Sequence, residues 1–247
     1  MATWKRQDGR RADELRAVKL TPGFVATADG SCLVEIGGTR VICTASFADG
    51  VPDWRVASGL GWLTAEYGML PGSTPQRRAR PVGRPDGRMV EIQRIIGRVL
   101  RGVVDFDKLG AQTVYLDCDV LEADGGTRTA AITGAQVALH EAVRAGAEAG
   151  RCEPTALTGR VAAVSVGVVN GRCLLDLDYH EDASADVDMN VAMAAGGAFV
   201  EVQGTGEGAG FAHKQLEDLL DLAERGIRKL LQAQREVIGP APSRTRR

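Results

Sequence analysis

Two halves of the sequence show the same order of elements, and this repetition constrains the fold more than any other feature. In the first half, β-rich runs flank Gly37-Gly38, and a strand-like run and an alanine-rich helix follow them. In the second half, β-rich runs flank Asn170-Gly171, and a short strand and an amphipathic helix follow. Such glycine-containing pairs between apolar runs are typical of hairpins. Strand pairs followed by helices predict an α+β fold.

The expected elements cover most of the chain. The expected strands span residues 25–36, 39–47, 113–121, 159–169, 172–179 and 199–203, and the expected helices span 90–104, 129–149 and 216–237. Segments 48–53 and 71–87 are rich in Gly, Pro and Asp, which predicts mobile connections. We expect residues 1–239 to form a single domain and residues 240–247 a disordered tail, because the tail has no apolar periodicity.

Length and composition exclude several classes of protein. At 247 residues with 44% hydrophobic content, the chain can bury a large core, which excludes a disordered protein. The five cysteines are odd in number, have no C-x-x-C spacing and stand in apolar runs, so we expect buried free thiols in a reducing compartment. The N-terminus has no apolar signal-peptide core, and no apolar run is long enough to span a membrane. We therefore expect a soluble, cytoplasmic protein.

Charge is distributed unevenly along the chain. The formal net charge of -2 gives no reason to expect an acidic partner. Between positions 77 and 101, however, eight arginines stand against two acids. In the helix expected over 90–104, apolar residues recur at three- and four-residue spacing, and Arg94, Arg98 and Arg101 lie on the opposite face. This segment therefore predicts a basic patch on a nearly neutral protein.

A glycine-rich junction links the strand at 113–121 to the helix at 129–149. Its sequence is Asp124-Gly125-Gly126-Thr127-Arg128-Thr129. Two glycines let backbone amides point into one concavity, the helix N-terminus favours an anion, and Arg128 adds a planar guanidinium that matches phosphate. The junction therefore predicts a phosphate site. The alternative is a tight turn with a surface arginine, because this spacing alone is a weak pattern.

Acidic and amide residues crowd the segment 181–190. Carboxylates this close raise one another's pKa unless a cation or an arginine neutralises them. Mg2+ suits a site with oxygen ligands, which waters and substrate phosphates complete. Asp182 and Asp188 are the pair that we expect to bind the metal, whereas Asp186 is expected to face solvent. The alternative is an acidic loop that caps a helix.

An anion-binding junction, a cationic helix face and a carboxylate pair together indicate phosphoryl transfer on a polyanion. Such chemistry requires groups that hold phosphate and balance its charge. The sequence has no Walker motif G-x-x-x-x-G-K-[ST], so a nucleoside triphosphate is not the expected ligand. We expect phosphate itself to be a substrate.

A series of family motifs runs in order along nearly the whole chain. They are Arg6-Gln7-Asp8-Gly9-Arg10 with Glu14-Leu15-Arg16, Gly61-Trp62-Leu63-Thr64-Ala65-Glu66-Tyr67, Glu91-Ile92-Gln93-Arg94-Ile95-Ile96-Gly97-Arg98, Asp117-Cys118-Asp119-Val120, residues 123–129, Glu181-Asp182, Asp188-Met189-Asn190 and Gln203-Gly204-Thr205-Gly206-Glu207. In this series the sequence resembles the ribonuclease PH family of tRNA nucleotidyltransferases, which is related to polynucleotide phosphorylase and the exosome core.

The resemblance implies a fold like the second domain of ribosomal protein S5, with a duplicated β-and-α unit and mixed sheets packed with helices. It implies a homohexameric ring made of three dimers. It also implies a phosphorolytic 3'-to-5' exoribonuclease that trims tRNA precursors with inorganic phosphate as co-substrate and releases nucleoside 5'-diphosphates. Because a phosphate ester is exchanged for a phosphoanhydride, the reaction should run backwards when nucleoside diphosphate is in excess.

The resemblance also assigns roles to particular positions. The family's phosphate site falls on Arg88, Gly126, Thr127 and Arg128. Its acidic pair, catalytic and Mg2+-binding, falls on Asp182 and Asp188, and which acid takes which role stays open. Ala212 departs from the family, in which Ser commonly opens the last helix.

The remaining arginines suit contacts with the RNA backbone that do not read bases. These are Arg77, Arg78 and Arg80 in the connection before the helix, together with Arg94 and Arg98 on it. The alternative is a solvated loop. The expected partners are tRNA precursors and other RNA 3' ends, with no DNA and no membrane.

Other features carry less weight. The segment Gly204–Ala209 imitates a dinucleotide motif but lacks a parallel βαβ unit. The three histidines share no metal-ligand spacing, and the three tryptophans are expected to pack. Two rival functions are a non-catalytic RNA-binding ring subunit, which would lack the acids or the phosphate arginines, and a hydrolytic nuclease, which would not need phosphate.

Overall fold

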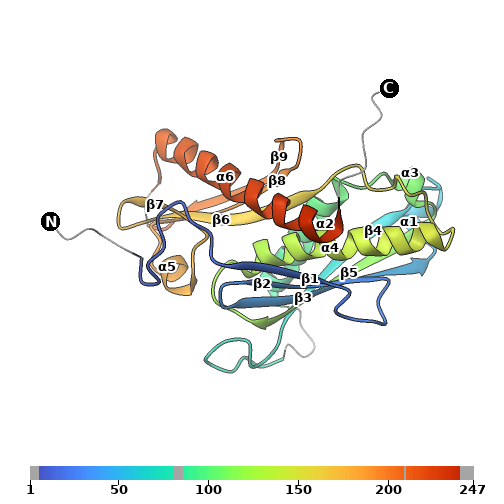
Figure 1. Cartoon of the computed structure of the whole chain (residues 1–247), viewed down its shortest axis with the longest axis horizontal. Coiled ribbons are helices and arrows are strands. Elements are labelled where there is room, and N and C mark those ends of the chain that lie inside the picture. Colours follow the sequence, from blue (N-terminus) through green and yellow to red (C-terminus); the bar gives the residue numbers. More distant parts are fainter. Residues whose placement is uncertain (1–5, 81–85, 209, 240–247) are drawn as a thin grey trace.

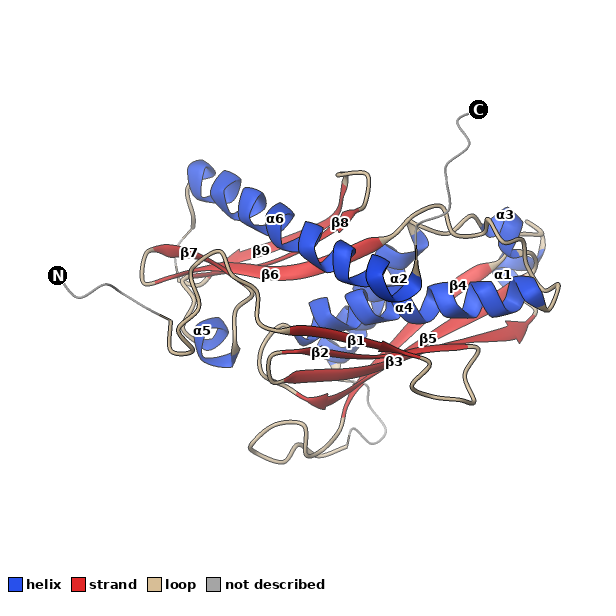
Figure 2. Ribbon diagram, viewed as in Figure 1, coloured by secondary structure: helices blue, strands red, loops and turns tan. Residues whose placement is uncertain are grey.

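The computed structural model describes residues 6–80, 86–208 and 210–239, and its strands form two sheets (Figure 1, Figure 2). The first sheet has the order β1-β2-β3-β5-β4. In it, β1 (Val18–Pro22), β2 (Gly30–Ile36), β3 (Thr39–Asp49) and β5 (Gln112–Glu122) pair antiparallel, and β4 (Trp62–Met69) runs parallel to β5. The short α1 (Asp53–Val56) precedes β4, and α2 (Gly87–Arg101) and α3 (Phe106–Leu109) lie in the crossover to β5.

The second sheet has the order β7-β6-β8-β9 and is antiparallel throughout. Its strands are β6 (Val161–Val169), β7 (Arg172–Leu175), β8 (Val187–Ala194) and β9 (Phe199–Gly206). Three further helices complete the fold: α4 (Thr127–Glu148) follows β5, α5 (Tyr179–Ala183) joins β7 to β8, and α6 (His213–Ile238) follows β9.

Helix α4 lies between the two sheets (Figure 1) and contacts β2 and β3 on one side and β6 on the other. It is buried around most of its circumference, which explains its many small residues. Gly134 permits the close approach, since a Cβ there would lie 2.7 Å from Cγ1 of Val34. One hydrophobic cluster includes residues of both sheets and of α2, α4 and α6, so a shared core fixes the two halves against each other.

The expected α+β fold is confirmed, and every expected strand and helix has a counterpart. Both hairpins turn at the expected glycines, which adopt the left-handed region at Gly37 (φ 57°) and Gly171 (φ 71°). The strand expected over 172–179 ends at Leu175, because Asp176 has a φ of 56° and turns the chain away from the sheet. Within the segment expected to be a mobile connection, β3 extends to Asp49 and α1 begins at Asp53.

Three strands were absent from the sequence prediction: β1, β4 and β8. The omission of β8 matters most, because the sequence analysis places no strand in the acidic segment 181–190, which contains Asp188. In β8 the apolar Val187 and Met189 are buried, and Asp188 and Asn190 alternate with them. This two-residue alternation is the normal pattern of a strand with one buried face, and the crowded carboxylates obscured it.

The free thiols are confirmed for all five cysteines, of which Cys32, Cys43 and Cys118 are buried. Burial raises the pKa of Cys32 to about 12, so this thiol stays protonated. Among the described helices, none combines the length and the apolar content needed to cross a membrane.

The start of α6 offers a direct test of helix capping. Ala212 occupies the N-cap with an extended backbone (φ −72°, ψ 154°), and it has no side-chain oxygen to accept a bond from the first turn. Gln215 supplies only the reverse bond, in which the Ala212 N–H donates to its Oε1 at 2.8 Å. Ala212→Ser should therefore raise the free energy of unfolding by about 0.5–2 kcal/mol, measured by urea denaturation. Ala212→Val, which cannot cap, should give no gain, and equal stabilisation by both variants would contradict this explanation.

Candidate active site

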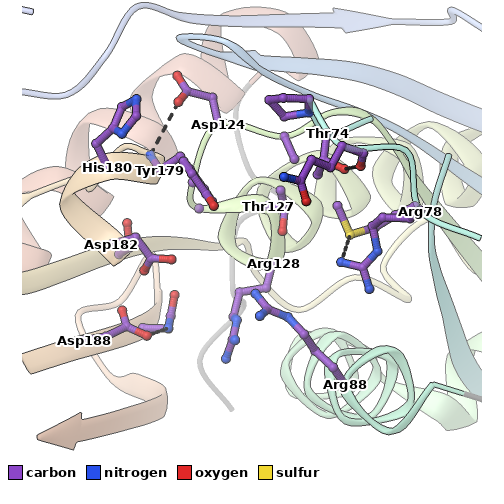
Figure 3. A pocket seen from close by; sticks show the side chains of 18 of the residues that line it. Thr74, Arg78, Arg88, Asp124, Thr127, Arg128, Tyr179, His180, Asp182 and Asp188 are labelled. Atoms are coloured by element: carbon purple, nitrogen blue, oxygen red, sulfur yellow. Dashed lines mark hydrogen bonds between the residues drawn. The ribbon is translucent and has the colours of Figure 1, made fainter. Parts of the chain in front are cut away.

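A cavity of about 800 Å³ opens where the N-terminus of α4 faces α5 and β8. It collects the predicted phosphate and acidic residues from both halves of the chain, together with one of the loop arginines: Arg78, Arg88, Gly126, Thr127, Arg128, Asp182 and Asp188. Figure 3 shows the side chains of Asp182 and Asp188 on one side, with the guanidinium groups of Arg88 and Arg128 beside them. The fold therefore brings cationic and acidic groups to one chamber.

The glycine turn before α4 is held in a shape that only glycine allows. Gly125 and Gly126 have φ values of 73° and 63°. A Cβ on Gly125 would lie 2.6 Å from the carbonyl oxygen of Leu177, so the turn packs directly on the chain that leads into α5. Thr39 Oγ1 donates to the Gly125 carbonyl at 2.7 Å. The first backbone N–H groups of α4 have no hydrogen-bond partner within the helix, and the glycine turn directs them at the cavity.

Side-chain contacts fix Thr127 and Arg128 at the start of α4. The hydroxyl of Tyr67 donates to Thr127 Oγ1 at 2.8 Å, and burial raises the pKa of Tyr67, so this hydroxyl stays a donor. Arg128 Nη1 donates to Gln203 Oε1 at 2.9 Å, and Gln203 Nε2 donates to Glu91 at 2.7 Å. Arg128 is therefore oriented by β9 and α2, and its other donors stay available to a ligand.

Asp86 organises the arginines at the start of α2. It is the N-cap of the helix and accepts a bond from the Arg88 N–H at 2.9 Å. Its other oxygen accepts from Arg78 Nη2 at 3.2 Å. Arg78 therefore holds the end of α2 that carries Arg88, whereas the Arg88 side chain is exposed at the cavity.

The two acids reach the cavity from different elements. Asp182 lies on α5, which Asp178 caps by accepting bonds from His180 and Glu181, each at 2.9 Å. The aspartate that caps α5 therefore stands before the acidic segment 181–190, four residues before Asp182. Asp188 lies on β8, where Asn190 Nδ2 donates weakly to its Oδ2 at 3.5 Å.

Burial raises the pKa of both carboxyl groups, and nearby charges modify the effect. For Asp182, Arg88, Arg128 and Arg16 oppose the increase. For Asp188, the neighbouring Asp182 adds to the increase, while Arg128 and Arg88 oppose it. Such opposing influences at one place are typical of functional sites.

The acidic pair fits a divalent cation. Asp188 Oδ1 is buried and has no hydrogen-bond partner among the described residues. A buried acceptor without a partner is expected to bind a positively charged group. No group of three or more His, Cys, Asp and Glu side chains is placed to hold a metal in the described part of the chain. A pair of carboxylates completed by waters and phosphate oxygens is the donor set that Mg2+ accepts and Zn2+ does not prefer.

Buried arginines near the N-terminus connect the two sides of the cavity. Arg16 donates from Nη2 to Asp176 Oδ1 at 2.7 Å and from Nη1 to the carbonyl of Asp124, next to the glycine turn. Arg6 pairs with Glu181 of α5 and donates to the Asp176 carbonyl at 2.8 Å. We call Arg6, Arg16 and Asp176 the N-terminal brace. It fixes the spacing between the glycine turn and α5.

Several predicted RNA-binding residues lie outside the cavity. Arg77 and Arg80 are exposed on the segment before α2, and Arg94 and Arg98 are exposed along α2. Arg98 pairs with Glu201 at 3.4 Å. Arg78, in contrast, lines the cavity. The five arginines therefore occupy different places, with one at the site and four around it.

Sequence reasoning assigned no role to the brace, Tyr67 or Gln203, although all of these residues except Asp176 stand in the family motifs. A buried arginine cannot be told from an exposed one by its neighbours in sequence. The structure also locates the dinucleotide-like segment that begins at Gly204. Strand β9 pairs antiparallel with β8, so Gly204 and Gly206 are not in a dinucleotide-binding unit. Trp54 and Trp62 pack against each other, as expected, with their ring centroids 4.7 Å apart.

Comparisons with known proteins show similarity along most of the chain. Residues 14–145 match the model of the 3' exoribonuclease family, domain 1, and residues 159–226 match that of domain 2. Curated proteins named ribonuclease PH from Corynebacterium glutamicum (strain R) and Corynebacterium efficiens are each 53% identical to this chain, covering 96% of it and 98% of their own lengths.

Solved structures of similar fold include two from archaeal exosomes. The Archaeoglobus fulgidus exosome with RNA bound to the active site has a TM-score of 0.78 at 25% identity, covering 92% of each chain. An archaeal exosome core has a TM-score of 0.76 at 25% identity, covering 94% of this chain and 91% of its own. Rice (Oryza sativa) Rrp46 shares the fold, with a TM-score of 0.77 at 16% identity, covering 94% of this chain and 100% of its own. With these matches and the site described above, the chain belongs to the ribonuclease PH family of 3' exoribonucleases.

Proposed function

We propose that the chain trims the 3' ends of tRNA precursors, and of other RNAs, by phosphorolysis in the 800 Å³ cavity. The observation that carries the proposal is the meeting of an anion-binding turn, two arginines and two buried carboxylates in one chamber. Phosphate is the co-substrate of this family, and the glycine turn with Arg88 and Arg128 suits it chemically.

Orthophosphate, held by Arg88, Arg128 and the first amides of α4, attacks the 3'-terminal phosphodiester in line. The bond to the 3' oxygen of the shortened RNA breaks, and a nucleoside 5'-diphosphate leaves. The two arginines balance the charge of two anions that would otherwise repel each other. One carboxyl of the pair Asp182 and Asp188 protonates the departing oxygen, a role that a raised pKa suits.

The ionised member of this pair would also hold Mg2+, and the buried Oδ1 of Asp188, which has no hydrogen-bond partner among the described residues, is an acceptor that fits such an ion. The ion supplies charge stabilisation at the phosphate oxygens when it is bound. The residues of the chain keep the two carboxylates together: Asp178 caps α5, and Arg6 anchors Glu181.

Phosphate omission tests the proposed function. An RNA with a 3' tail should be shortened only when phosphate is present, and the released products should be nucleoside diphosphates. Excess nucleoside diphosphate should extend the same RNA. Release of nucleoside monophosphates in phosphate-free buffer would instead show a hydrolase.

We further propose that residues 1–239 fold as one unit and assemble into a ring of six copies in the cytoplasm. The exosome cores of similar fold support a ring of such subunits, and the free cysteines fit a reducing compartment. The tail expected at 240–247, Arg84 and Ala209 lie outside the described residues. Particle mass from light scattering tests the assembly.

The exposed arginines outside the cavity should control tRNA binding more than chemistry. Arg77 and Arg80 lie at a distance from the reacting groups, whereas Arg78 holds Asp86 at the start of α2. The double variant Arg77→Ala/Arg80→Ala should therefore weaken tRNA binding and reduce its salt dependence, with a slope smaller by roughly 1.4 to 1.8, depending on how much of the contact is with single strand or duplex. Phosphorolysis of a very short oligonucleotide should stay near normal.

Arg78→Ala serves as the contrasting variant. It should slow even the short oligonucleotide, because Asp86 loses a partner beside Arg88. Equal losses on both substrates for the double variant would contradict the division between binding and chemistry.

A further inference from the structure

The cavity contains one aromatic surface that the phosphorolysis chemistry does not use. Tyr179 lies on α5, three residues before Asp182, so both side chains project from the same face of the helix. Figure 3 shows the ring of Tyr179 directed into the cavity, on the side of the acidic pair. Tyr179 is 56% exposed, which is a high exposed fraction for a tyrosine in the wall of a cavity.

The backbone of Tyr179 and its ring each have a contact, although the residue is 56% exposed. Its backbone N–H donates to Asp124 Oδ1 at 3.4 Å. The ring of His180 meets it edge to face, with centroids 5.6 Å apart and an interplanar angle of 68°. Helix α5 is in turn fixed by the Asp178 cap and by the pair of Arg6 with Glu181. A fixed, exposed ring loses little freedom when a flat ligand stacks on it.

The other described walls of the cavity offer a base no aromatic ring. Arginines, carboxylates, the glycine turn and small polar groups suit the phosphates and the cation. Of the described residues that line the cavity, only Tyr179 and His180 carry aromatic rings. In phosphorolysis the terminal nucleotide has its phosphate at the reacting groups, so its base must lie one ribose away from the arginines and the acidic pair.

We propose that Tyr179 is the stacking surface for the base of the 3'-terminal nucleotide. The inference rests on the proposed function and specifies where its substrate binds. Every base has a flat aromatic face, so stacking on Tyr179 accepts all four bases, as an exonuclease that removes successive nucleotides requires. His180 acts as a positioning residue, because its ring packs against that of Tyr179.

A binding experiment tests the contact without any reaction. A short RNA with 2-aminopurine as its 3'-terminal base is titrated with protein in buffer that lacks phosphate and Mg2+. Stacking should quench the 2-aminopurine fluorescence with wild-type protein and with Tyr179→Phe, which keeps the ring. Tyr179→Ala should lose most of the quenching. Phe24→Ala removes an exposed aromatic residue outside the cavity and should quench like the wild type.

A kinetic experiment separates the base contact from a structural effect. Two oligonucleotides are compared that differ only in the last residue, which is a normal nucleotide in one and an abasic ribose with both hydroxyls in the other. For release of the first residue, wild-type kcat/KM should favour the normal oligonucleotide by about 5- to 150-fold, the value of one stacked base. Tyr179→Ala should remove that preference by slowing only the normal oligonucleotide, with the KM for phosphate unchanged.

The possible outcomes distinguish this inference from others. Equal losses on both oligonucleotides, or a changed particle mass for Tyr179→Ala, would overturn it and point to a ring covered by a second copy of the chain. A wild-type enzyme without preference for the base would also overturn it. If the wild type released nothing from either oligonucleotide in phosphate, the proposed function would fail, while quenching that depends on Tyr179 would still support the base site.

Discussion

Arg128→Ala should lower kcat/KM for phosphate by roughly 100- to 1000-fold, the cost of removing one preorganised electrostatic group from an active site. Arg128 is held by Gln203 at 2.9 Å and faces the cavity, so its loss removes a positioned charge where two anions meet. Binding of RNA in the absence of phosphate should change much less. Initial rates measured over a range of phosphate concentrations at saturating RNA give the comparison.

Two further variants control this result. Arg128→Lys keeps the charge but loses the planar fork, so it should fall between the wild type and the alanine variant. Arg144 lies near the other end of the same helix, is exposed and pairs with Glu141 at 2.9 Å. Arg144→Ala should therefore leave the phosphate dependence intact. An Arg128→Ala enzyme with the wild-type KM and kcat for phosphate would exclude the proposed phosphate site.

Asp188→Asn should lower kcat by roughly 100- to 10,000-fold and, at the same time, make the protein more stable at neutral pH. Burial raises the pKa of Asp188 above its ordinary value of 3.8, and Asp182 raises it further. The folded state then binds the proton more tightly than the unfolded chain does. Stability is lost as the pH rises from about 3.8 through the raised pKa, so the ionised Asp188 makes the protein less stable at neutral pH than at acidic pH.

Asparagine carries no charge and avoids this loss. The melting temperature of Asp188→Asn without added metal should exceed that of the wild type at pH 7, by about 2–4 °C for each kcal/mol gained. The difference should disappear at acidic pH. Adding Mg2+ should raise the melting temperature of the wild type and not that of the variant, because only the wild type binds the ion.

Asp186→Asn is the matched control, since Asp186 stands in the same segment but is exposed. It should change neither activity nor stability appreciably. A decrease in the stability of Asp188→Asn at pH 7 would show that the carboxylate is compensated in the folded protein, and would contradict the proposed cation site.

The sequence predicted the elements whose pattern is local. The helix at 90–104 and the glycine junction at 124–129 depend on spacing and turn chemistry within a few residues, and both occur in the structure. Strand β8 was not found, because its alternation begins within a segment crowded with carboxylates, which resembles a polar loop. Its position beside β6 is set by tertiary pairing, which local sequence does not contain.

The sequence was sufficient to predict which residue types form the site. It was not sufficient to predict which other residues hold them in position. The side-chain types of Arg128, Asp182 and Asp188 are enough to predict phosphate binding by the arginine and cation binding by the two carboxylates. The partners that hold them come from distant positions: Arg6 bonds to Glu181 across 175 residues, and Arg16 to Asp176 across 160. Such pairs follow from the folded arrangement, so a single sequence does not identify them.

The N-terminal brace also has a consequence for synthesis of the protein on the ribosome. Arg6 and Arg16 find their partners only when residues 176–181 have been made, about 160 to 175 residues later in the chain. Until then the glycine turn lacks its neighbours from the second half of the chain, and contacts this distant in sequence form late in folding. An unfinished chain should therefore be unable to degrade RNA, and a peptide fused directly before Arg6 should delay maturation of the enzyme.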